Sequence, residues 1–437
     1  MLLISLDKEG TAFPPLGLLS IGSTLLENGI KTKIIDIEID DDYEKEVIRN
    51  LDDCAFVGVS AMPYQIASGL NIAGLIRKHN ANIPIVWGGC YPTINPTQII
   101  NDPLCDVVVI GEGEDICLDL WKSDFKVNSL KEINCICYKQ DNAVKMNDNK
   151  INFDFNMDNL PFPRYELLKM ERYISARGFS EYFPNIKTSF SINVGKGCPY
   201  SCSFCHNSNV NRKRQGRLSK SAVRIADEIE YVIKKYKVEF FELVDDNFYC
   251  DKNRIIEFLN EIERRDLHFK WSTNARADSF KENFLSVSLL KNMKRLGLSV
   301  ICCGVESGSR KILHNVLKKD ISFDSIYRAA SYSYKSDLIL RCNFMLGIPG
   351  ENIIDLFKTM FLMKRISWHP KIKICPQWYR PIPGTELYLE AVRLGYKHAS
   401  TLREWAYMRP HEKYFNSAII KSYKIVGPIL KFFIKIY

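Results

Sequence analysis

The sequence predicts an α/β protein of two successive domains, a doubly wound parallel sheet of Rossmann-like architecture followed by a partial (β/α)6 barrel. Three observations lead to this prediction. The chain has 437 residues, which is too long for one ordinary hydrophobic core. Apolar runs alternate with amphipathic stretches over residues 1–122, and a second alternation of the same kind begins at about residue 186.

Five short apolar runs predict the strands of the first sheet, over residues 2–6, 32–37, 55–60, 83–87 and 106–110. The helices are predicted by amphipathic stretches between them, which include residues 16–27, 65–79 and 114–122. Small residues follow several strand ends, as in Ser60-Ala61, Gly88-Gly89 and Gly111-Glu112-Gly113. Because ligands of such sheets bind outside the carboxyl ends of the strands, we expect these positions to lie at a ligand.

The second alternation predicts six strands, over residues 188–194, 239–244, 270–273, 299–305, 339–345 and 372–378. Helices are expected over residues 219–236, 253–264, 288–296, 323–334 and 353–366, and Ser219 is the expected N-cap of the first. Six such units predict an open barrel with its chemistry at the loops after the strands. The predicted domains are residues 1–125 and 186–395, with a connector over 126–185 and a C-terminal extension over 396–437.

Composition and charge argue against several classes of protein. With 46% hydrophobic and 25% charged residues, the chain is expected to be soluble and globular. It shows neither a secretory signal nor an apolar window of about 18 residues, so we expect it in the cytoplasm. The net charge of +9 is spread along the chain, so no nucleic-acid partner is expected, and Arg212-Lys213-Arg214 is interpreted as a solvated loop.

The chain contains 14 cysteines, which in the absence of an export signal indicate a reducing compartment rather than a disulfide framework. Free cysteine behaves as a small hydrophobe in a core. Eight cysteines lie in or beside apolar runs and are predicted to be core residues, namely Cys54, Cys90, Cys105, Cys135, Cys302, Cys303, Cys342 and Cys375.

Three other cysteines, Cys198, Cys202 and Cys205, form a C-x3-C-x2-C pattern in a polar loop directly after the first barrel strand. Thiolates are the ligands of iron–sulfur clusters, and three ligands from one loop leave one iron of a [4Fe–4S] cluster open to a substrate. A zinc site with His206 as its fourth ligand is the alternative. Structural zinc, however, usually takes its ligands from two separated pairs.

With Phe204 just before the last cysteine, this loop resembles that of the radical S-adenosylmethionine (SAM) superfamily. The resemblance implies that the open iron chelates SAM and that an electron donor such as flavodoxin or ferredoxin drives its cleavage to a 5′-deoxyadenosyl radical. Segments 241–248, 304–308, 344–351 and 379–386, each at a strand end, resemble further motifs of the superfamily. They imply SAM contacts from Phe204, Asp246, Gly304, Glu306, Ser307 and Gly347. Candidates for substrate contact at the end of the sixth strand are Trp378, Tyr379 and Arg380.

The first half resembles the cobalamin-binding domain found ahead of many radical SAM enzymes, through residues 13–18, 59–61, 87–93 and 111–114. A flat corrin needs glycine-lined strand ends, and its nucleotide tail needs hydroxyl donors. The implied contacts are Ser60, Gly88, Gly89, Thr93, Gly111 and Glu112. The loop over residues 7–15 has no histidine, and His79 falls at a predicted helix end, so we expect a cobalt without a histidine ligand. A vestigial domain that no longer binds cobalamin is the alternative.

Residues 417–437 are apolar except for four lysines that share one helical face, Lys421, Lys424, Lys431 and Lys435. Such a helix lies in a membrane interface, which would suit a lipid or polyisoprenoid substrate, or it packs on the barrel. The leading functional hypothesis is a cobalamin-dependent radical SAM enzyme that methylates an unactivated carbon. The alternatives are an anaerobic oxidative cyclase like those of porphyrin pathways, which the chain also resembles, and a sensor that is not an enzyme.

Overall fold

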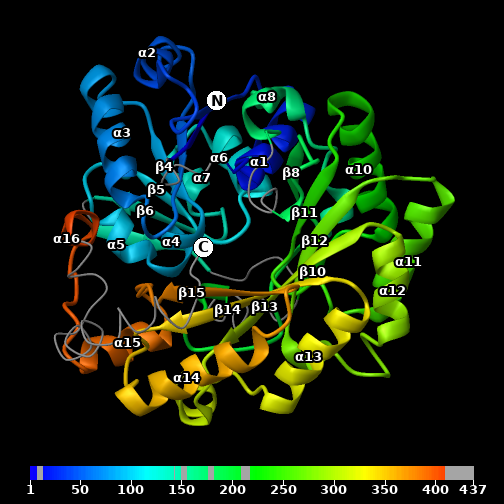
Figure 1. Ribbon diagram of the computed structural model, residues 1–437. Coiled ribbons are helices and arrows are strands. Elements are labelled where there is room, and N and C mark those ends of the chain that lie inside the picture. Colours follow the sequence, from blue (N-terminus) through cyan, green and yellow to red (C-terminus); the bar gives the residue numbers. More distant parts are fainter. Residues whose placement is uncertain (7–12, 142, 149–154, 176–181, 208–216, 409–437) are drawn as a thin grey trace. The chain divides into compact units, whose positions relative to one another are not determined.

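The computed structural model describes residues 1–6, 13–141, 143–148, 155–175, 182–207 and 217–408. These form two compact units (Figure 1). Unit 1 holds the described residues of Met1–Ile174 together with Ala399–Met408, and unit 2 holds those of Ser175–Ser208 and Arg217–His398. The predicted fold class, a doubly wound sheet followed by a partial barrel, is confirmed.

Unit 1 is built on a seven-stranded sheet of order β2-β1-β3-β4-β5-β6-β7. Its strands are β1 (Leu2–Ser5), β2 (Lys33–Asp36), β3 (Val57–Ser60), β4 (Ile85–Gly88), β5 (Val107–Val109), β6 (Ile136–Gln140) and β7 (Ala143–Met146). The first five are parallel, and β6 and β7 continue the sheet antiparallel. All five predicted strands are therefore present, each within two residues of its predicted ends.

Helices cover both faces of this sheet, as the doubly wound prediction requires. They are α1 (Leu16–Glu27), α2 (Tyr43–Arg49), α3 (Ile66–His79), α4 (Cys90–Ile94), α5 (Pro96–Ile100), α6 (Glu114–Ser123), α7 (Val127–Leu130) and α8 (Met170–Tyr173), with 3-10 turns η1 (Met157–Asn159) and η2 (Tyr165–Leu167). Helix α1 packs against α6, and α2 packs against α3 (Figure 1).

Two segments of unit 1 differ from the predicted domain boundaries. Residues 126–174, predicted as a connector, belong to unit 1 because β6 and β7 extend its sheet. The short helix α16 (Leu402–Tyr407), predicted to lie in a separate C-terminal extension, also belongs to unit 1 and packs against α3.

Helix α16 is held on unit 1 by specific contacts. The Trp405 side chain is fully buried, stacks on the Tyr91 ring at a centroid distance of 6.1 Å, and donates its Nε1–H to the carbonyl oxygen of Pro63 at 2.7 Å. The Arg403 guanidinium pairs with the Asp102 carboxylate at 2.8 Å. The chain thus returns to its first unit after completing the second.

Replacing Trp405 with Phe should lower the free energy of unfolding by about 1–3 kcal/mol, because the buried carbonyl of Pro63 loses its donor while most of the ring packing remains. Trp121→Phe is the matched control, since Trp121 belongs to the same unit and is 44% exposed. Urea unfolding of both variants measures the difference. Equal stability of the two variants would mean that the indole N–H contributes nothing to the docking of α16.

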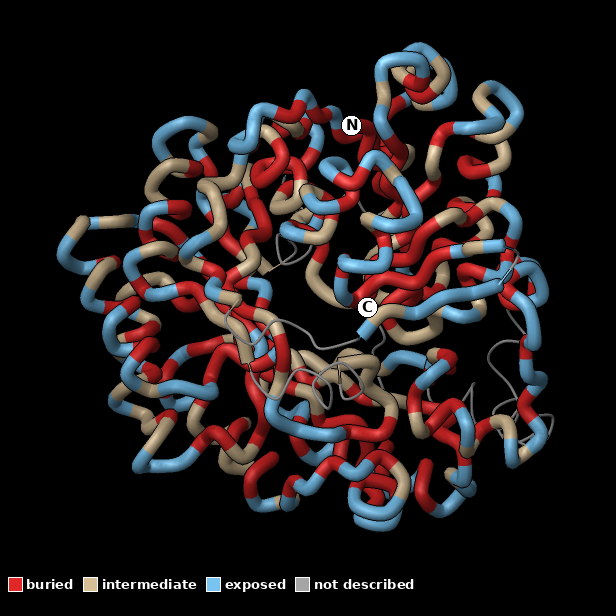
Figure 2. The backbone as a smooth tube through the Cα atoms, turned by 180° about the vertical axis from the view of Figure 1, so that it is seen from behind, coloured by how far each residue is buried: buried red, intermediate tan, exposed pale blue. Residues whose placement is uncertain are grey.

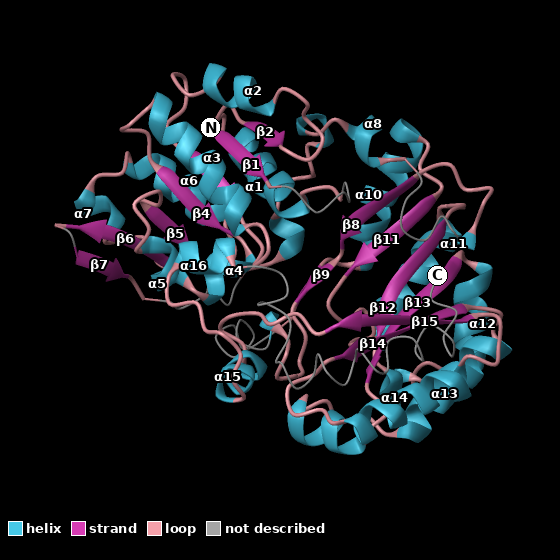
Figure 3. Cartoon of the chain, turned by 60° about the vertical axis from the view of Figure 1, so that its left-hand side comes forward, coloured by secondary structure: helices cyan, strands magenta, loops and turns pink. Residues whose placement is uncertain are grey.

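Unit 2 is built on a six-stranded parallel sheet of order β15-β14-β13-β12-β11-β8 (Figure 3). Its strands are β8 (Ser189–Asn193), β11 (Phe240–Val244), β12 (Lys270–Ala275), β13 (Leu298–Glu306), β14 (Ile339–Leu346) and β15 (Ile372–Trp378). A separate antiparallel pair consists of β9 (Gly195–Lys196) and β10 (Leu218–Ser219). The six predicted strands of the partial barrel are all present.

The helices between these strands are α10 (Ala222–Tyr236), α11 (Lys252–Arg264), α12 (Val287–Arg295), α13 (Phe323–Lys335) and α14 (Ile353–Ile366), and α15 (Glu386–Arg393) follows the last strand. Shorter turns are η4 (Ala277–Ser279) and the π-helical η5 (Lys311–Val316). The prediction of Ser219 as N-cap is wrong. Ser219 pairs with Gly195 in the β9–β10 ladder, and Ser221 caps α10 by accepting a hydrogen bond from the Arg224 N–H.

The two faces of the unit 2 sheet differ in character. Trp271 of β12 contacts Phe258 of α11, with ring centroids 5.6 Å apart, so it lies on the face that the helices cover. Because successive side chains alternate between faces, Ser272 and Asn274 point to the other face, which we call the inner face. Most strands of the two sheets are buried, although β7 is exposed and β15 is mostly half-buried or exposed (Figure 2).

Five of the eight cysteines predicted as core residues are buried, namely Cys105, Cys135, Cys302, Cys303 and Cys342. The prediction is wrong for Cys54, Cys90 and Cys375, which are half-buried. Apolar neighbours in the sequence do not distinguish the covered face of a strand from its inner face, and Cys375 lies on the inner face of β15.

Candidate functional site

The three-cysteine loop follows β8 and β9 at the carboxyl end of the unit 2 sheet. Its entry is a glycine turn, with Gly197 at φ +87° and its N–H donating to the Asp246 carboxylate at 2.6 Å. Its middle is tied down through Ser203, whose N–H donates to the Leu317 carbonyl at 3.0 Å and whose hydroxyl donates to the Val316 carbonyl at 2.6 Å. The loop is therefore anchored to parts of unit 2 that lie far away in the sequence.

Within this loop Cys202 is buried, whereas Cys198 and Cys205 are half-buried. Burial raises the pKa of the Cys198 thiol, and it raises the pKa of the Cys205 thiol to about 11. Among the described residues, no group of three or more His, Cys, Asp or Glu side chains is close enough to hold one metal ion. In a [4Fe–4S] cluster each thiolate binds a different iron, so its ligands need not converge on one point.

Two cations lie beside Cys202. The Nη1 of buried Arg276 is 3.9 Å from the Cys202 Sγ, and its guanidinium stacks 3.5 Å from the centroid of the Tyr200 ring. Burial acts to lower the pKa of Lys319, but the Glu306 carboxylate outweighs it and Cys202 adds to the effect, so the pKa is raised. Positive charge favours thiolate over thiol, so this environment fits an anionic thiolate-bound cluster.

The predicted SAM contacts lie at four strand ends of unit 2. Asp246 follows β11 and is exposed, and its carboxylate accepts the Gly197 N–H described above. Gly304 and Glu306 lie at a bulge near the end of β13, where Glu306 has φ +66°. A Cβ on Gly304 would lie 2.3 Å from Glu306 Oε1 and 2.7 Å from Lys319 Nζ, so a larger residue there would displace the ends of these two side chains.

The remaining predicted SAM contacts are Ser307, Gly347 and Phe204. Ser307 is fully buried, with its Oγ 3.1 Å from the Thr359 Oγ1. Gly347 ends β14 in a left-handed turn at φ +76°, and its N–H donates to the Glu351 carboxylate at 2.9 Å. Phe204 is half-buried in the cysteine loop. Four of the six candidates, Asp246, Gly304, Phe204 and Gly347, therefore have at least partly exposed or turn-forming positions, which fit a ligand at this sheet end, whereas Glu306 and Ser307 are buried.

The buried pair of Glu306 and Lys319 has no counterpart among the sequence predictions. Lys319 Nζ lies 2.9 Å from Glu306 Oε1, and both side chains are almost completely buried. The polar run Lys318-Lys319-Asp320 looks like a solvated loop in the sequence, so no local signal marked Lys319.

The predicted cobalamin contacts of unit 1 lie together at the carboxyl ends of β3, β4 and β5. Gly89 has φ +94°, and a Cβ there would lie 2.9 Å from the Ser60 Oγ and 3.0 Å from the Ala61 N. Gly88 ends β4 and is half-buried. The glycine pair therefore brings the backbone close to the end of β3, as a site for a large flat ligand requires.

Thr93 links two of these strand ends. Its hydroxyl donates to the Gly89 carbonyl at 2.7 Å and accepts the Gly111 N–H at 3.1 Å. The donor role that we expected toward a nucleotide tail is thus already used within unit 1. Gly111 has φ +93°, and it and Glu112 are half-buried. His79 is the last residue of α3, as predicted, and its Nδ1 lies 3.0 Å from the Leu75 carbonyl.

The predicted substrate contacts at the end of β15 do not share one environment. Tyr379 is buried, and its N–H donates to the Leu346 carbonyl at 2.8 Å. Trp378 is 43% exposed and pairs in register with Leu346, on the opposite side of the strand from Cys375. Arg380 is exposed. Sequence reasoning missed two charged residues inside predicted strands, Glu242 and Arg341, which both lie on the inner face.

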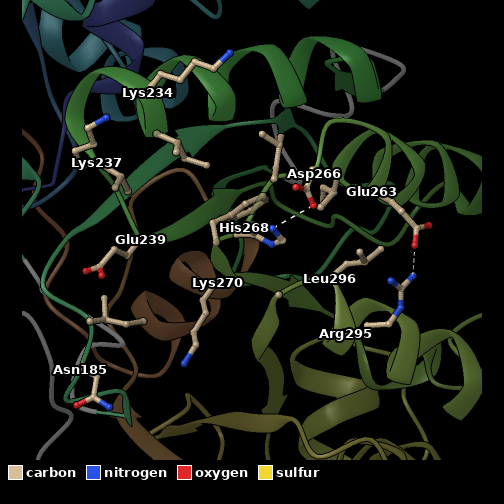
Figure 4. Close-up of a pocket in the computed structure, with 17 residues that line it drawn as sticks. Asn185, Lys234, Lys237, Glu239, Glu263, Asp266, His268, Lys270, Arg295 and Leu296 are labelled. Carbon is tan, nitrogen blue, oxygen red and sulfur yellow. Dashed lines mark ion pairs between the residues drawn. The ribbon is translucent and has the colours of Figure 1, made fainter.

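A hollow of about 940 Å³ lies at the opposite end of the same strands (Figure 4). It is lined by charges of both signs, which include Lys237, Glu239, Asp266 and Lys270. Since these residues precede β11 and β12 or begin them, the hollow lies at the amino ends of the strands. The loops that carry chemistry in βα barrels lie at the carboxyl ends, so we assign it no role in the site.

No helix among the described residues has the length and apolarity that crossing a bilayer requires. The lysine face predicted over residues 417–437 and the run Arg212-Lys213-Arg214 both lie outside the described residues.

Comparison with protein families assigns both units. Residues 4–120 match the B12 binding domain, and residues 192–363 match the radical SAM superfamily. An uncharacterized methyltransferase of Pyrococcus horikoshii is 29% identical over 388 residues, covering 88% of this chain and 79% of the relative. An anaerobic magnesium-protoporphyrin IX monomethyl ester cyclase of Rubrivivax gelatinosus is 26% identical over 360 residues, covering 81% of this chain but 61% of the cyclase.

A solved structure shares the fold. The radical SAM methyltransferase TsrM of Kitasatospora setae, determined with tryptophan substrate and a SAM analogue, matches with a TM-score of 0.77 at 15% identity, over 99% of this chain and 88% of its own. The two domains imply a [4Fe–4S] cluster, SAM and cobalamin as cofactors, in agreement with the thiols, cations and glycine turns described above. The chain is therefore an enzyme of the radical SAM superfamily and belongs with the members that carry a B12-binding domain ahead of the barrel.

Proposed function

We propose that this enzyme transfers a methyl group to an unactivated carbon of a small molecule. The observation that carries the proposal is the joining of a B12-binding and a radical SAM domain in one chain, which a methyltransferase relative shares over 79% of its length. When bound, the cluster and SAM supply a radical that removes a hydrogen atom, and cobalamin supplies the methyl group.

The protein's own residues hold and shield these groups. Cys198, Cys202 and Cys205 provide the three thiolates, and Arg276 and Lys319 balance their negative charge. Asp246 fixes the entry to the cysteine loop through the Gly197 N–H. In unit 1, Gly88 and Gly89 allow the corrin to approach the backbone, and Ser60 lies beside them.

The proposal is tested by feeding cells methionine with a deuterated methyl group and comparing metabolites and lipids with and without the gene. We expect one compound that carries the labelled methyl only when the gene is present, and its loss when the gene encodes Cys202→Ala. If the gene-dependent compound instead gains oxygen or loses hydrogens without the label, methylation is wrong.

An oxidative cyclase is the second candidate, because the chain is 26% identical to the Rubrivivax cyclase. Two features favour methylation over it. The identity is lower, and the match leaves more than a third of the cyclase uncovered, whereas it covers most of the methyltransferase. The same labelling experiment separates the two reactions by product mass.

Two partners complete the proposal. Flavodoxin or ferredoxin is the proposed electron donor for the cluster. Peripheral membrane contact through residues 417–437, with a lipid or isoprenoid substrate, stays a prediction, and liposome flotation with and without these residues tests it.

A further inference from the structure

The inner face of the unit 2 sheet carries charged side chains in the middle of its strands. Residues that pair in register across parallel strands lie on the same face. Across β12 to β15, the pairing forms one row of Asn274, Cys302, Arg341 and Lys373. Across β8, β11 and β12, it forms a neighbouring row of Ser191, Glu242 and Ser272.

The character of the inner face changes along the strands. Toward the amino ends it is apolar, because Phe240 and Val300 pack with Ile186, Tyr182 and Phe183. Further along it becomes polar and accessible, with Asn274 exposed and Val244 41% exposed. The interiors of βα barrels are normally filled by branched apolar side chains. The polar stretch lies between the apolar amino ends of the strands and the cysteine loop. It differs from the usual apolar barrel interior, and we therefore examine it as a ligand site.

The charged side chains of this stretch are arranged around Arg341. Its Nη2 donates to the Cys375 Sγ at 3.0 Å. The Glu242 carboxylate accepts the Ser191 hydroxyl at 3.0 Å, and although burial raises the pKa of Glu242, the Arg341 charge opposes that rise. Lys373 lies next to Arg341 in the row, with its Nζ 5.8 Å from the Tyr182 ring. Arg341 and Lys373 thus lie next to each other in the row, and the Arg341 charge acts on the Glu242 carboxylate.

Half-buried charges lower the stability of the folded protein unless a partner or a ligand compensates them. Taking a charge out of water costs several kcal/mol, and replacing buried charges by apolar groups is often neutral or stabilising. An arginine also presents a planar fork that fits a carboxylate or phosphate with two hydrogen bonds. Beside this group, the Oδ1 of Asn343 is buried and has no hydrogen-bond partner among the described residues, so it can accept a hydrogen bond from a donor group of a ligand but does not bind its anion.

We propose that Arg341 and Lys373 form an anion-binding subsite on the inner face, which holds a carboxylate or phosphate group of the substrate. Anion binding itself does not depend on the proposed function. Only the identification of the bound anion as part of the substrate rests on it. With this subsite, the substrate is a negatively charged molecule, or a zwitterion whose cationic group faces Glu242, rather than a neutral hydrocarbon.

Cys375 provides a built-in reporter, because its sulfur lies next to the Arg341 guanidinium. The full-length, anaerobically reconstituted enzyme is alkylated with iodoacetate, which is anionic, or with iodoacetamide, which is neutral, and labelling of Cys375 is followed by peptide mass spectrometry. Both reagents react with the thiolate, so the rate with iodoacetate divided by the rate with iodoacetamide does not depend on the fraction of thiolate. We expect this ratio at Cys375 to exceed that of N-acetylcysteine by about tenfold.

Variants test whether the preference of Cys375 for iodoacetate over iodoacetamide comes from Arg341 and Lys373. Arg341→Gln should return the ratio to that of N-acetylcysteine, Lys373→Gln should lower it partly, and Arg341→Lys should keep part of it. Arg295→Gln is the charge-matched control, since Arg295 is exposed and belongs to the hollow at the other end of the strands. Thermal unfolding shows whether each variant is folded, and Arg341→Lys keeps the test valid if Arg341→Gln is not.

Competition by acetate or by inorganic phosphate shows whether the subsite prefers a carboxylate or a phosphate group. Slower iodoacetate labelling in acetate but not in inorganic phosphate indicates a carboxylate, and the reverse indicates a phosphate. An unchanged ratio in Arg341→Gln, or protection by neither anion at the highest tolerated concentration, would overturn the subsite. Alkylation requires no SAM cleavage, so these outcomes do not depend on whether the enzyme transfers methyl groups.

Discussion

Replacing any one of Cys198, Cys202 or Cys205 with Ala should abolish the bound cluster and lower reductive SAM cleavage by at least about 10³-fold, since groups that act as a unit fail together. Each single substitution should therefore cost about as much as the triple one. Iron and acid-labile sulfide per chain, together with 5′-deoxyadenosine formed from SAM, measure the two effects.

Cys250→Ala is the matched control. Cys250 is exposed and lies close enough to Cys198 for their charges to interact, but it is outside the three-cysteine loop. It should keep full iron, sulfide and SAM cleavage. A Cys202→Ala protein that retained stoichiometric iron and sulfide, or a Cys250→Ala protein that lost them, would contradict the ligand assignment.

Replacing Lys319 with Met should lower the free energy of unfolding of unit 2 by about 3–5 kcal/mol, because it leaves the Glu306 carboxylate buried without its cation. The double variant with Glu306→Gln should recover most of this loss, since no charge then remains unpaired. Denaturant unfolding of both single variants and the double variant gives the coupling energy.

The neighbouring lysine supplies the control for this prediction. Lys318 pairs with Glu386, and both side chains are at least 40% exposed, so Lys318→Met should cost no more than about 1 kcal/mol. The pKa of Lys319 is raised in the folded state. Its stabilising effect should therefore be complete below the unfolded pKa of about 10.4 and be lost only as the pH rises through the folded value. A Lys319→Met deficit that stayed unchanged as the pH rose above the folded pKa of Lys319 would contradict the pairing.

Local patterns carried most of what could be predicted. The cysteine loop is recognisable because all its ligands lie within eight residues, and the strands because buried parallel strands are continuous apolar runs. The sequence also contained evidence for the position of Arg341 that the prediction did not use. It lies between Leu340 and Cys342 in an apolar strand, and alternation alone places it on the opposite face from both.

Pairings across long stretches of sequence could not be predicted in this way. Trp405 stacks on Tyr91 and bonds to Pro63, but nothing in a six-residue helix specifies partners so far upstream. Lys319 and Glu306 are 13 residues apart, and Glu306 lies at a bulge of β13 with φ +66°. Both features arise from tertiary structure that a single sequence does not encode locally.

The return of α16 to unit 1 has a consequence for how the protein is made. Trp405 is synthesised 342 residues after Pro63, which at 5–20 residues per second is a delay of roughly 17 to 70 s on the ribosome. During that interval the nascent first unit exposes the apolar surface around Tyr91, while the whole second unit emerges behind it. Chaperone dependence and loss through premature termination should therefore concentrate on the first unit, although it is the first to be translated.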